Sequence, residues 1–393
     1  MTDIQKDPFL RVVSGGQTTS LQDRGRFGFQ DKGVPPSGVL NQNAMKIVNK
    51  LVGNNIEEAV LEIFLSGPIL EVNAKNALVS LIGSNSSSIE IINRNVKIRP
   101  GRSIKVFEKD IIKINSGNEN LISLFSISGG FNVTKVLGSK STNPSVIMGG
   151  FKGGFLEDNM NLPLNNNIHK YHESLIPKFK SHDQVKIFRV IIGPHVDKFT
   201  NDEINKFLST SWKVTKDINR MGIKLTGNKI NSIAGRDMLS DGNQIGSIQI
   251  TLSGEPIVLL PDRGTIGGYP KIATIISSDL ELIPSLKIGQ KIRFESINID
   301  EAKKINIEFE RKTNKKVKDK FPNVLEEVRG KGLLRGIKLK VDNVEFLNHL
   351  FENKMLAVKA SENLVRLLPP LIVGKKEIDE AVLIIEKVCE SFK

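Results

Sequence analysis

The stretch of residues 259–274, LLPDRGTIGGYPKIAT, joins two predicted buried strands. The apolar runs 257–260 and 272–276 predict these strands. Between them the backbone can turn sharply at Gly264, Gly267 and Gly268. The same turn carries polar side chains on Asp262, Arg263, Thr265, Tyr269 and Lys271. Binding groups are common on loops that a rigid scaffold holds, so the stretch predicts a functional site. The structural alternative is a tight hairpin with a satisfied Asp–Arg pair.

Short apolar or alternating runs, separated by turns, dominate the chain up to about residue 304. Runs of this length and spacing are typical of a sandwich or barrel rather than of βαβ units. They are 60–65, 69–72, 77–82, 88–92, 104–107, 111–114 and 122–127, followed later by 185–192, 247–252 and 286–294. A polar, Asn-rich segment over 159–184 separates the two groups. We therefore predict a mainly β protein with two β-rich halves, at about 8–160 and 185–304.

Two short helices are predicted among the strands. Asn41 or Asn43 is the expected N-cap of the first, because the apolar residues that follow recur at helical spacing: Ala44, Ile47, Val48 and Leu51. Thr200 followed by Glu203 forms a capping box, which predicts a second helix that runs to about Leu208.

Composition excludes several classes of protein. The 393 residues are 39% hydrophobic and 25% charged, as expected for a soluble globular protein. With the single cysteine Cys389, no secretory h-region and no membrane-spanning run, the chain is expected to be cytoplasmic and without membrane contact. The net charge of +13 is spread out and aromatic residues are few, which argues against nucleic-acid binding. No metal is expected, because His169, His172 and His182 lack a known ligand spacing.

Two further loops are rich in polar groups. The first, over 15–26, carries Asp23, Arg24 and Arg26, and its guanidinium groups could grip a carboxylate or phosphate. A polar turn with local ion pairs is the alternative there. The second contains GSKST at 138–142, where backbone amides and hydroxyls could surround an anion. Glycine-rich corners of a barrel would explain it equally well.

Several motifs in one order resemble a known family. They are GGQTTSLQDRGRFGFQDKGVPPSG, NKLVGN, AVLEIFLSGP, ISGGF, GSKST, MGGFKG, NRMGIKL, SDGNQIGSIQI and PDRGTIGGYPKIAT. Together they resemble the biotin-dependent carboxyltransferase-type family of the 5-oxoprolinase C subunit, also called allophanate hydrolase subunit 2 or urea amidolyase-related protein. The resemblance covers residues 8–304. It implies a cyclophilin-like β-barrel architecture and a homologous partner, the B subunit, with a shared site where the two meet.

The resemblance also implies a chemistry. With its B subunit and a further A subunit, the 5-oxoprolinase complex uses ATP to open 5-oxo-L-proline to L-glutamate. In urea carboxylase the equivalent domain transfers a carboxyl group from carboxybiotin to urea, so biotin is expected only for that reaction. Both reactions need donors aimed at a developing oxyanion and a positioned proton acceptor.

The residues that could supply these groups lie in the matching motifs. As catalytic candidates we take Arg220, Gln249, Asp262, Arg263, Thr265 and Tyr269. As candidates for binding the substrate or an anion we take Asp23, Arg24, Arg26, Asp241, Lys271, Gly267 and Gly268. Among them Asp23, Asp241 and Asp262 are either bases or groups that orient an arginine.

The sequence departs from the family pattern at five positions. Polar side chains common in the family are replaced by Gly264, Ile266, Asn219, Asn41 and Gly154. Losing several polar groups from one site would alter the substrate or weaken activity. A non-catalytic regulatory or interaction protein of the same fold is therefore the alternative function.

The C-terminal part has a different character. A basic run within 305–319 predicts a linker. Within 320–393, the motifs EEVRGKGL and VRLLPPL resemble the small domain of class III, acetylornithine-type aminotransferases, in which the arginine matching Arg366 holds the substrate carboxylate. The large cofactor domain with its Schiff-base lysine has no counterpart here, so no PLP chemistry is expected. We predict a small α+β fragment.

Overall fold

The computed structural model describes residues 7–166, 186–234, 238–302, 321, 323–331, 334–353, 357–360, 363–367 and 384–392. The chain folds as two compact units, Met1–Ala302 and Lys303–Lys393. The basic run at 305–319, most of the segment 159–184 and its three histidines lie outside the described residues. None of the described helices is long and apolar enough to cross a membrane.

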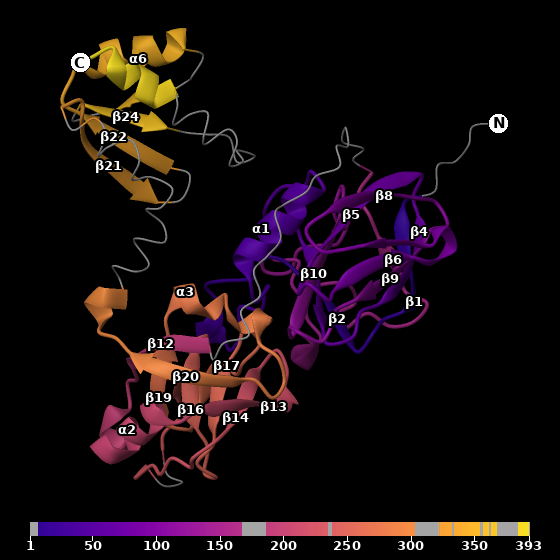
Figure 1. The fold of residues 1–393 in the computed structure, drawn as a ribbon, viewed down its shortest axis with the longest axis vertical. Coiled ribbons are helices and arrows are strands. Elements are labelled where there is room, and N and C mark those ends of the chain that lie inside the picture. The colour runs from indigo at the N-terminus through magenta and orange to yellow at the C-terminus, as the bar shows by residue number, and fades with distance from the viewer. Residues whose placement is uncertain are drawn as a thin grey trace. The chain divides into compact units, whose positions relative to one another are not determined.

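The first half of unit 1 is built from two antiparallel sheets (Figure 1). One sheet has the order β11 (Asn161–Pro163), β1 (Phe9–Ser14), β4 (Ile69–Asn73), β9 (Ile111–Asn115), β6 (Ser88–Ile91) and β7 (Val96–Ile98). The other has the order β2 (Thr18–Gln22), β3 (Val60–Phe64), β10 (Ile122–Ile127), β5 (Asn76–Ile82) and β8 (Ser103–Phe107). One core cluster takes residues from both sheets, among them Leu10, Leu61 and Ile112.

Two strands of the five-stranded sheet, β3 and β10, are buried on both faces. Because successive side chains of a strand point to opposite faces, Leu61 and Phe125 enter the core between the sheets, while Val60 and Leu124 enter a second core. That second core includes Met45 and other residues of helix α1 (Gln42–Leu51), together with the interior of the second half. This explains why β3 and β10 are buried along their whole length. The second core is therefore shared by the two halves of unit 1, whereas the first belongs to the first half.

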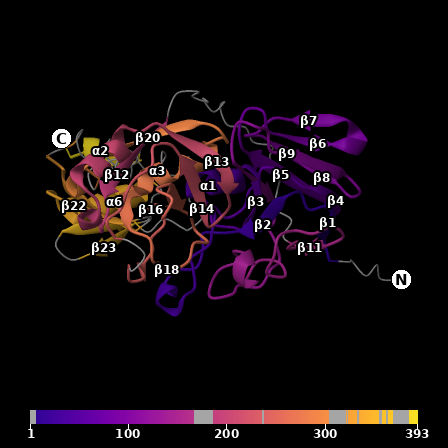
Figure 2. The same cartoon turned by 90° about the horizontal axis from the view of Figure 1, so that it is seen from below.

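The second half of unit 1 is a closed seven-stranded barrel, which lies beside the first half in Figures 1 and 2. Its order is β12 (Lys186–Ile192), β19 (Lys271–Ile275), β16 (Ser247–Ile250), β17 (Pro256–Leu259), β14 (Gly222–Thr226), β13 (Trp212–Ile218) and β20 (Lys291–Ser296). Parallel pairing of β12 with β20 closes the ring. Helix α2 (Asn201–Ser209) packs on it through Phe207, whose ring stacks on Phe294 at 4.8 Å.

Short elements complete unit 1. The 3-10 turns are η1 (Gln30–Lys32), η2 (Ile92–Arg94), η3 (Pro144–Val146), η4 (Val196–Lys198) and η5 (Ile283–Ser285). There is also a short helix, α3 (Ser277–Leu280). A two-stranded pairing joins β15 (Asp241–Gly242) to β18 (Ile266–Gly267) outside the barrel.

The mainly β prediction is confirmed, and both predicted helices are present. The side chain of Asn41 caps α1 by accepting a hydrogen bond from the amide of Ala44 at 2.7 Å, so Asn43 lies inside the helix. Thr200 caps α2 through the amide of Glu203 at 3.3 Å. The hairpin alternative for 259–274 is wrong, because β17 and β19 do not pair with each other. Each pairs with β16, which lies between them.

Unit 2 is a small α+β unit in its described part. Its sheet has the order β21 (Leu325–Lys331), β22 (Leu334–Leu339), β24 (Leu364–Leu367) and β23 (Val358–Ala360). Helix α6 (Asn343–Glu352) and a helix described over 384–390 cover it, with Phe346, Leu350 and Val388 in the core. Arg366 lies in β24, in register with Gly336 and Val358.

Candidate functional site

A buried charge cluster joins the two halves of unit 1. Arg220, in the turn between β13 and β14, donates from Nε to Asp262 Oδ2 at 2.7 Å and from Nη2 to Asp262 Oδ1 at 3.2 Å. Its Nη1 donates to Glu62 of β3, and its Nη2 also donates to the carbonyl of Gly38 at 2.7 Å. Glu62 in turn accepts from the amide of Leu40 at 2.8 Å. The motifs NRMG and PDRG therefore meet Glu62 of a third motif, AVLEIFLSGP, which was not among the candidate site residues.

The charges of this cluster depend on one another. Burial raises the pKa of Glu62, although Arg220 opposes the rise. Burial by itself would lower the pKa of Arg220, but the two carboxylates outweigh it and raise that pKa above its usual range. All three nitrogens of Arg220 donate within the protein. Arg220 and Asp262 thus hold each other and the interface in place, and catalytic roles for them stay predictions.

Asp23 is the anion that the glycine-rich loop at 138–142 surrounds. Its Oδ1 accepts from the hydroxyls of Ser139 and Ser141, both at 2.6 Å, and from the amide of Gly25 at 2.8 Å. Its Oδ2 accepts from the amide of Lys140 at 2.7 Å. Burial would raise the pKa of Asp23, but these hydrogen bonds outweigh it and lower the pKa. The loop therefore binds a carboxylate of its own chain, which leaves those donors engaged.

The two arginines of the first polar loop have different environments. Arg26 is buried and donates from Nη2 to the carbonyl of Ser141, while its Nε and Nη1 have no partner among the described residues. Burial lowers the pKa of Arg26, and Asp23 and Asp262 oppose that change. The side chain of Arg24 is 67% exposed and pairs with Glu57 at 3.6 Å. Of the two arginines, only Arg26 is buried near the charged groups of Asp23, Asp262 and Arg220.

Asn243 organises the loop that follows β17; it belongs to the motif SDGNQIGSIQI but was not among the candidate site residues. Its carbonyl accepts from Arg263 Nη2 at 3.0 Å, and its amide donates to the carbonyl of Thr265 at 2.8 Å. Its side chain donates to the carbonyl of Gly264 at 3.1 Å and accepts from Gln249 Nε2 at 3.2 Å. Burial lowers the pKa of Arg263 to about 10, which leaves it charged at neutral pH.

A side chain at Gly267 would displace the side-chain amides of Asn243 and Gln249. A Cβ there would lie 2.7 Å from Asn243 Nδ2 and 2.9 Å from Gln249 Nε2, closer than real contacts allow. Gly268 meets nothing nearer than 3.5 Å, so it is less constrained. The rim of the loop faces solvent, with Ile266 65% and Tyr269 40% exposed.

A second ion cluster lies at the edge of the barrel, where β15 meets the start of β19. Lys271 is only 2% exposed and donates to Asp241 Oδ2 at 2.7 Å and to the carbonyl of Gly242 at 2.6 Å. Asp241 keeps 54% of its side chain exposed, and the hydrogen bond from Lys271 lowers its pKa. Of the three aspartates considered as bases, Asp23 and Asp262 are buried and engaged, and Asp241 faces solvent.

His195, which precedes η4, completes this cluster and was not among the sequence candidates. Its Nδ1 accepts from the amide of Lys271 at 3.0 Å, so in the neutral ring Nε2 carries the proton and lies 3.4 Å from Asp241 Oδ2. The contact depends on chain segments about 45 and 75 residues apart, so no local spacing could reveal it. Among the described residues, no group of three His, Cys, Asp or Glu could hold a metal ion.

We expect His195 to make the stability of unit 1 depend on pH. Burial lowers its pKa from 6.5 and Lys271 lowers it further, against the opposing effects of Asp241 and Asp197. The unfolded chain therefore takes up this proton first, and stability falls as the pH drops from about 6.5 through the lower folded pKa. The urea midpoint, followed by the fluorescence of the single Trp212, should fall more between about pH 7.5 and about pH 5.5 in the wild type than in His195→Gln. Equal pH slopes in the two proteins would contradict this role.

The family departures have local explanations in two places. Asn219 Oδ1 accepts from the amides of Met221 at 2.8 Å and Gly222 at 3.3 Å, as a carboxylate oxygen would. Asn41 caps α1 and also donates from Nδ2 to the carbonyl of Glu281 at 3.0 Å, a bond that an Asp could not make. Gly154 has open space around its Cβ direction, and nothing in the structure explains the absence of a side chain there.

Comparisons with known proteins agree with this architecture. Residues 32–296 match the model of the carboxyltransferase domain, subdomain A and B. The chain is 29% identical over 296 residues to the 5-oxoprolinase C subunit of Escherichia coli K12, covering 75% of this chain and 93% of that protein. It is 26% identical over 317 residues to urea amidolyase of Saccharomyces cerevisiae, which covers 75% of this chain but only 17% of the relative. The solved K. lactis urea amidolyase shares the fold, with a TM-score of 0.69, 22% identity and coverage of 98% of this chain and 27% of that one.

The C-terminal part matches a different group. Residues 286–389 match the model of class III aminotransferases. A segment of 72 residues is 46% identical to acetylornithine aminotransferase of Brucella melitensis and covers 18% of each chain. The similarity thus extends to less than a fifth of that enzyme.

Proposed function

The chain belongs to the carboxyltransferase domain, subdomain A and B family, and from this premise we propose that it is the C-type component of an ATP-dependent 5-oxoprolinase or of a closely related amide-directed carboxyltransferase. The observation that carries the proposal is the alignment with nearly the whole length of a 5-oxoprolinase C subunit. The reaction proposed first is the opening of 5-oxo-L-proline to L-glutamate. Biotin enters only if the reaction resembles that of urea carboxylase.

The geometry supports a site around Asp241 and the 262–269 loop. Asp241 is a solvent-facing carboxylate fixed by Lys271 and His195, and it can accept a hydrogen bond from an amide N–H of the substrate. Its lowered pKa keeps it ionised at neutral pH, so it acts as an acceptor that orients the amide. Arg263 and Gln249 fix the loop that carries Thr265 and Tyr269 beside it. Asp262, at the start of this loop, is held in place by its ion pair with Arg220.

We propose that a partner protein completes the site, because the cavity at the buried charge cluster is small. The cavity that reaches Arg220 and Glu62, between the two halves, measures only about 80 Å³. Sites for small molecules usually measure about 300–1,000 Å³. ATP enters the proposal as a co-substrate of the complex. The loop at 138–142 is not proposed as its phosphate site, because the amide of Lys140 and the hydroxyls of Ser139 and Ser141 already bind Asp23. A homologous B subunit, joined by an A subunit for the full reaction, would complete the site.

The test is reconstitution with candidate partners. The chain should co-purify with a homologue of the B subunit, and the complex that also contains the A subunit should release glutamate from 5-oxo-L-proline only when ATP is present. Tight binding to the B subunit without turnover on 5-oxoproline or urea would instead favour a regulatory role. The exposed Ile266 and the absence of a side chain at Gly264 support that role, because neither residue supplies a polar group at the rim of the loop. Failure to bind any homologue of the B subunit would contradict both functions.

A further inference from the structure

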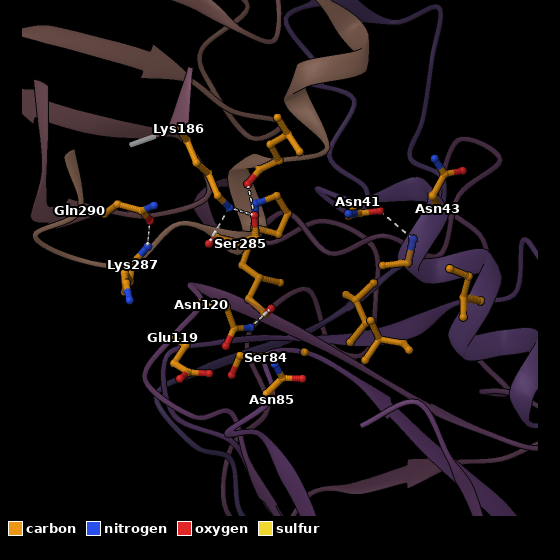
Figure 3. A pocket seen from close by; sticks show the side chains of 18 residues that line it. Asn41, Asn43, Ser84, Asn85, Glu119, Asn120, Lys186, Ser285, Lys287 and Gln290 are labelled. Carbon is orange, nitrogen blue, oxygen red and sulfur yellow. Dashed lines mark hydrogen bonds between the residues drawn. The ribbon is translucent and has the colours of Figure 1, made fainter. Parts of the chain in front are cut away.

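A cavity of about 390 Å³ lies between the two halves of unit 1, and no residue assigned to the candidate site lines it (Figure 3). Its volume falls within the usual range of small-molecule sites. Helix α1 forms one wall. Another wall includes η5 and the loop before β10, which are joined because the amide of Leu121 donates to the carbonyl of Pro284 at 3.0 Å. The cavity is therefore built from segments of both halves.

Much of the cavity lining is apolar. Most of these residues belong to α1, β5 and β10 of the first half, and two belong to the barrel half: Ala44, Ile47, Ile82, Ile122 and Leu124, then Leu282 and Pro284. Moving apolar surface from water to such an environment is favourable. The lining therefore favours a ligand with a hydrocarbon chain.

Lys186, the first residue of β12, brings a positive charge to the barrel side of the cavity (Figure 3). Its Nζ donates to the carbonyl of Ser285 at 3.0 Å and to the hydroxyl of the same residue, which leaves one of its three N–H donors for a further acceptor. Burial lowers the pKa of Lys186, the charge of Lys287 lowers it further, and no carboxylate of the described residues opposes them. A bound anion would supply the missing opposite charge.

Gln290, in the turn before β20, offers a second donor on the same side (Figure 3). Its Oε1 accepts from the amide of Lys287 at 3.1 Å, and its Nε2 donates to none of the described residues. Glu119 also lines the cavity, but it is exposed and forms no ion pair within the described part of the chain. Solvent screens its charge, so the donors of Lys186 and Gln290 decide the polarity of the barrel side.

From this arrangement we propose that the cavity binds a medium-chain aliphatic carboxylate. The carboxylate accepts from Lys186 Nζ and Gln290 Nε2, and the hydrocarbon chain lies against the apolar residues of α1, β5 and β10. The charge-assisted hydrogen bond from a half-buried ammonium group selects the anion, and the apolar walls select the chain. The inference rests on this cavity alone and does not depend on the proposed function.

The experiment is titration calorimetry of octanoate into the purified full chain. Two matched probes have the same hydrocarbon chain: octan-1-ol is neutral, and octylammonium is positively charged. Octanoate should bind saturably with one site per chain, and each probe should bind about tenfold more weakly or worse, because the charge-assisted hydrogen bond to Lys186 is lost. Absence of saturable octanoate binding up to about 10 mM, or equal affinity for octanoate and octan-1-ol, would overturn the proposal.

Variants locate the binding in this cavity. Lys186→Met removes the charge but keeps a long side chain, and should weaken octanoate binding about tenfold while leaving octan-1-ol binding nearly unchanged. Ala44→Leu, on α1, should weaken the binding of both by filling space, and it keeps a good helix former. Lys216→Met changes an exposed lysine on β13 and should alter neither affinity. Wild-type octanoate affinity in Lys186→Met, with wild-type Trp212 fluorescence as the check of folding, would contradict the assignment whatever Ala44→Leu does.

Discussion

Arg220→Ala is expected to lower the free energy of unfolding of unit 1 by about 3–5 kcal/mol, the largest stability effect that we predict for a single substitution. The change leaves Asp262 and Glu62 buried at the junction of the halves without the cation that both contact. It also removes the donor to the carbonyl of Gly38. Urea unfolding followed by Trp212 measures the effect on the barrel, since Trp212 is the only tryptophan and is fully buried there.

Two further variants identify the cause. Lys224 lies on β14, the strand that follows Arg220, and Lys224→Ala breaks its ion pair with Glu255. This pair is near the surface, so the urea midpoint should hardly move. Combining Arg220→Met with Glu62→Gln and Asp262→Asn removes all three charges together and should recover much of the lost stability, because no unpaired buried charge is left. A wild-type midpoint for Arg220→Ala, or no recovery in the triple variant, would show that the cluster does not hold the halves together.

Asp241→Asn is expected to reduce kcat/KM of the reconstituted complex about 100-fold while leaving the urea midpoint nearly unchanged. The amide is isosteric, and its one oxygen can still accept from Lys271 Nζ, as Asp241 Oδ2 does at 2.7 Å. The bond from the amide of Gly242 to Oδ1, also 2.7 Å, is lost, which costs little because the side chain is 54% exposed. What is lost is the negative charge that would orient the substrate amide. The effect should therefore appear in turnover and not in folding.

The matched control is Asp217→Asn, which neutralises an exposed carboxylate on β13 of the same barrel. It should leave both kcat/KM and stability unchanged. An Asp241→Asn complex with wild-type turnover would remove Asp241 from the substrate site. A large fall in the urea midpoint for this variant would mean that the cluster with Lys271 and His195 serves the fold of the barrel.

Local patterns were sufficient for most elements of unit 1. The capping side chains of Asn41 and Thr200 act within three residues of themselves, so their helices could be predicted from a short window. Short apolar runs likewise predicted strands, because alternation along a strand is a local property. Closure of the barrel was beyond such patterns, since it depends on β12 pairing with β20 about a hundred residues later.

The site shows the same division between local and distant effects. The sequence pointed to Asp23, Arg220, Asp262 and Lys271 as polar groups in glycine-rich motifs. Their partners were not visible, because Glu62 lies in a run that reads as an ordinary strand and His195 lies in a turn. Arg24 and Arg26 had looked equivalent, yet one faces solvent and the other is buried, since the turn at Gly25 has a positive φ of 99° and separates their directions.

The sequence by itself determined that this protein is mainly β, which motifs carry its polar groups, and that its first three quarters resemble the carboxyltransferase family. Alternation is enough for the mainly β class, because it follows from which side chains can be buried at each step along a strand. The resemblance rests on the motifs and their order. Only the tertiary structure decided that Asp23 and Asp262 serve as internal counter-ions while Asp241 remains open to solvent. The physical reason is that the role of a carboxylate depends on burial and on the donors around it, and those donors come from strands and loops far away in the chain.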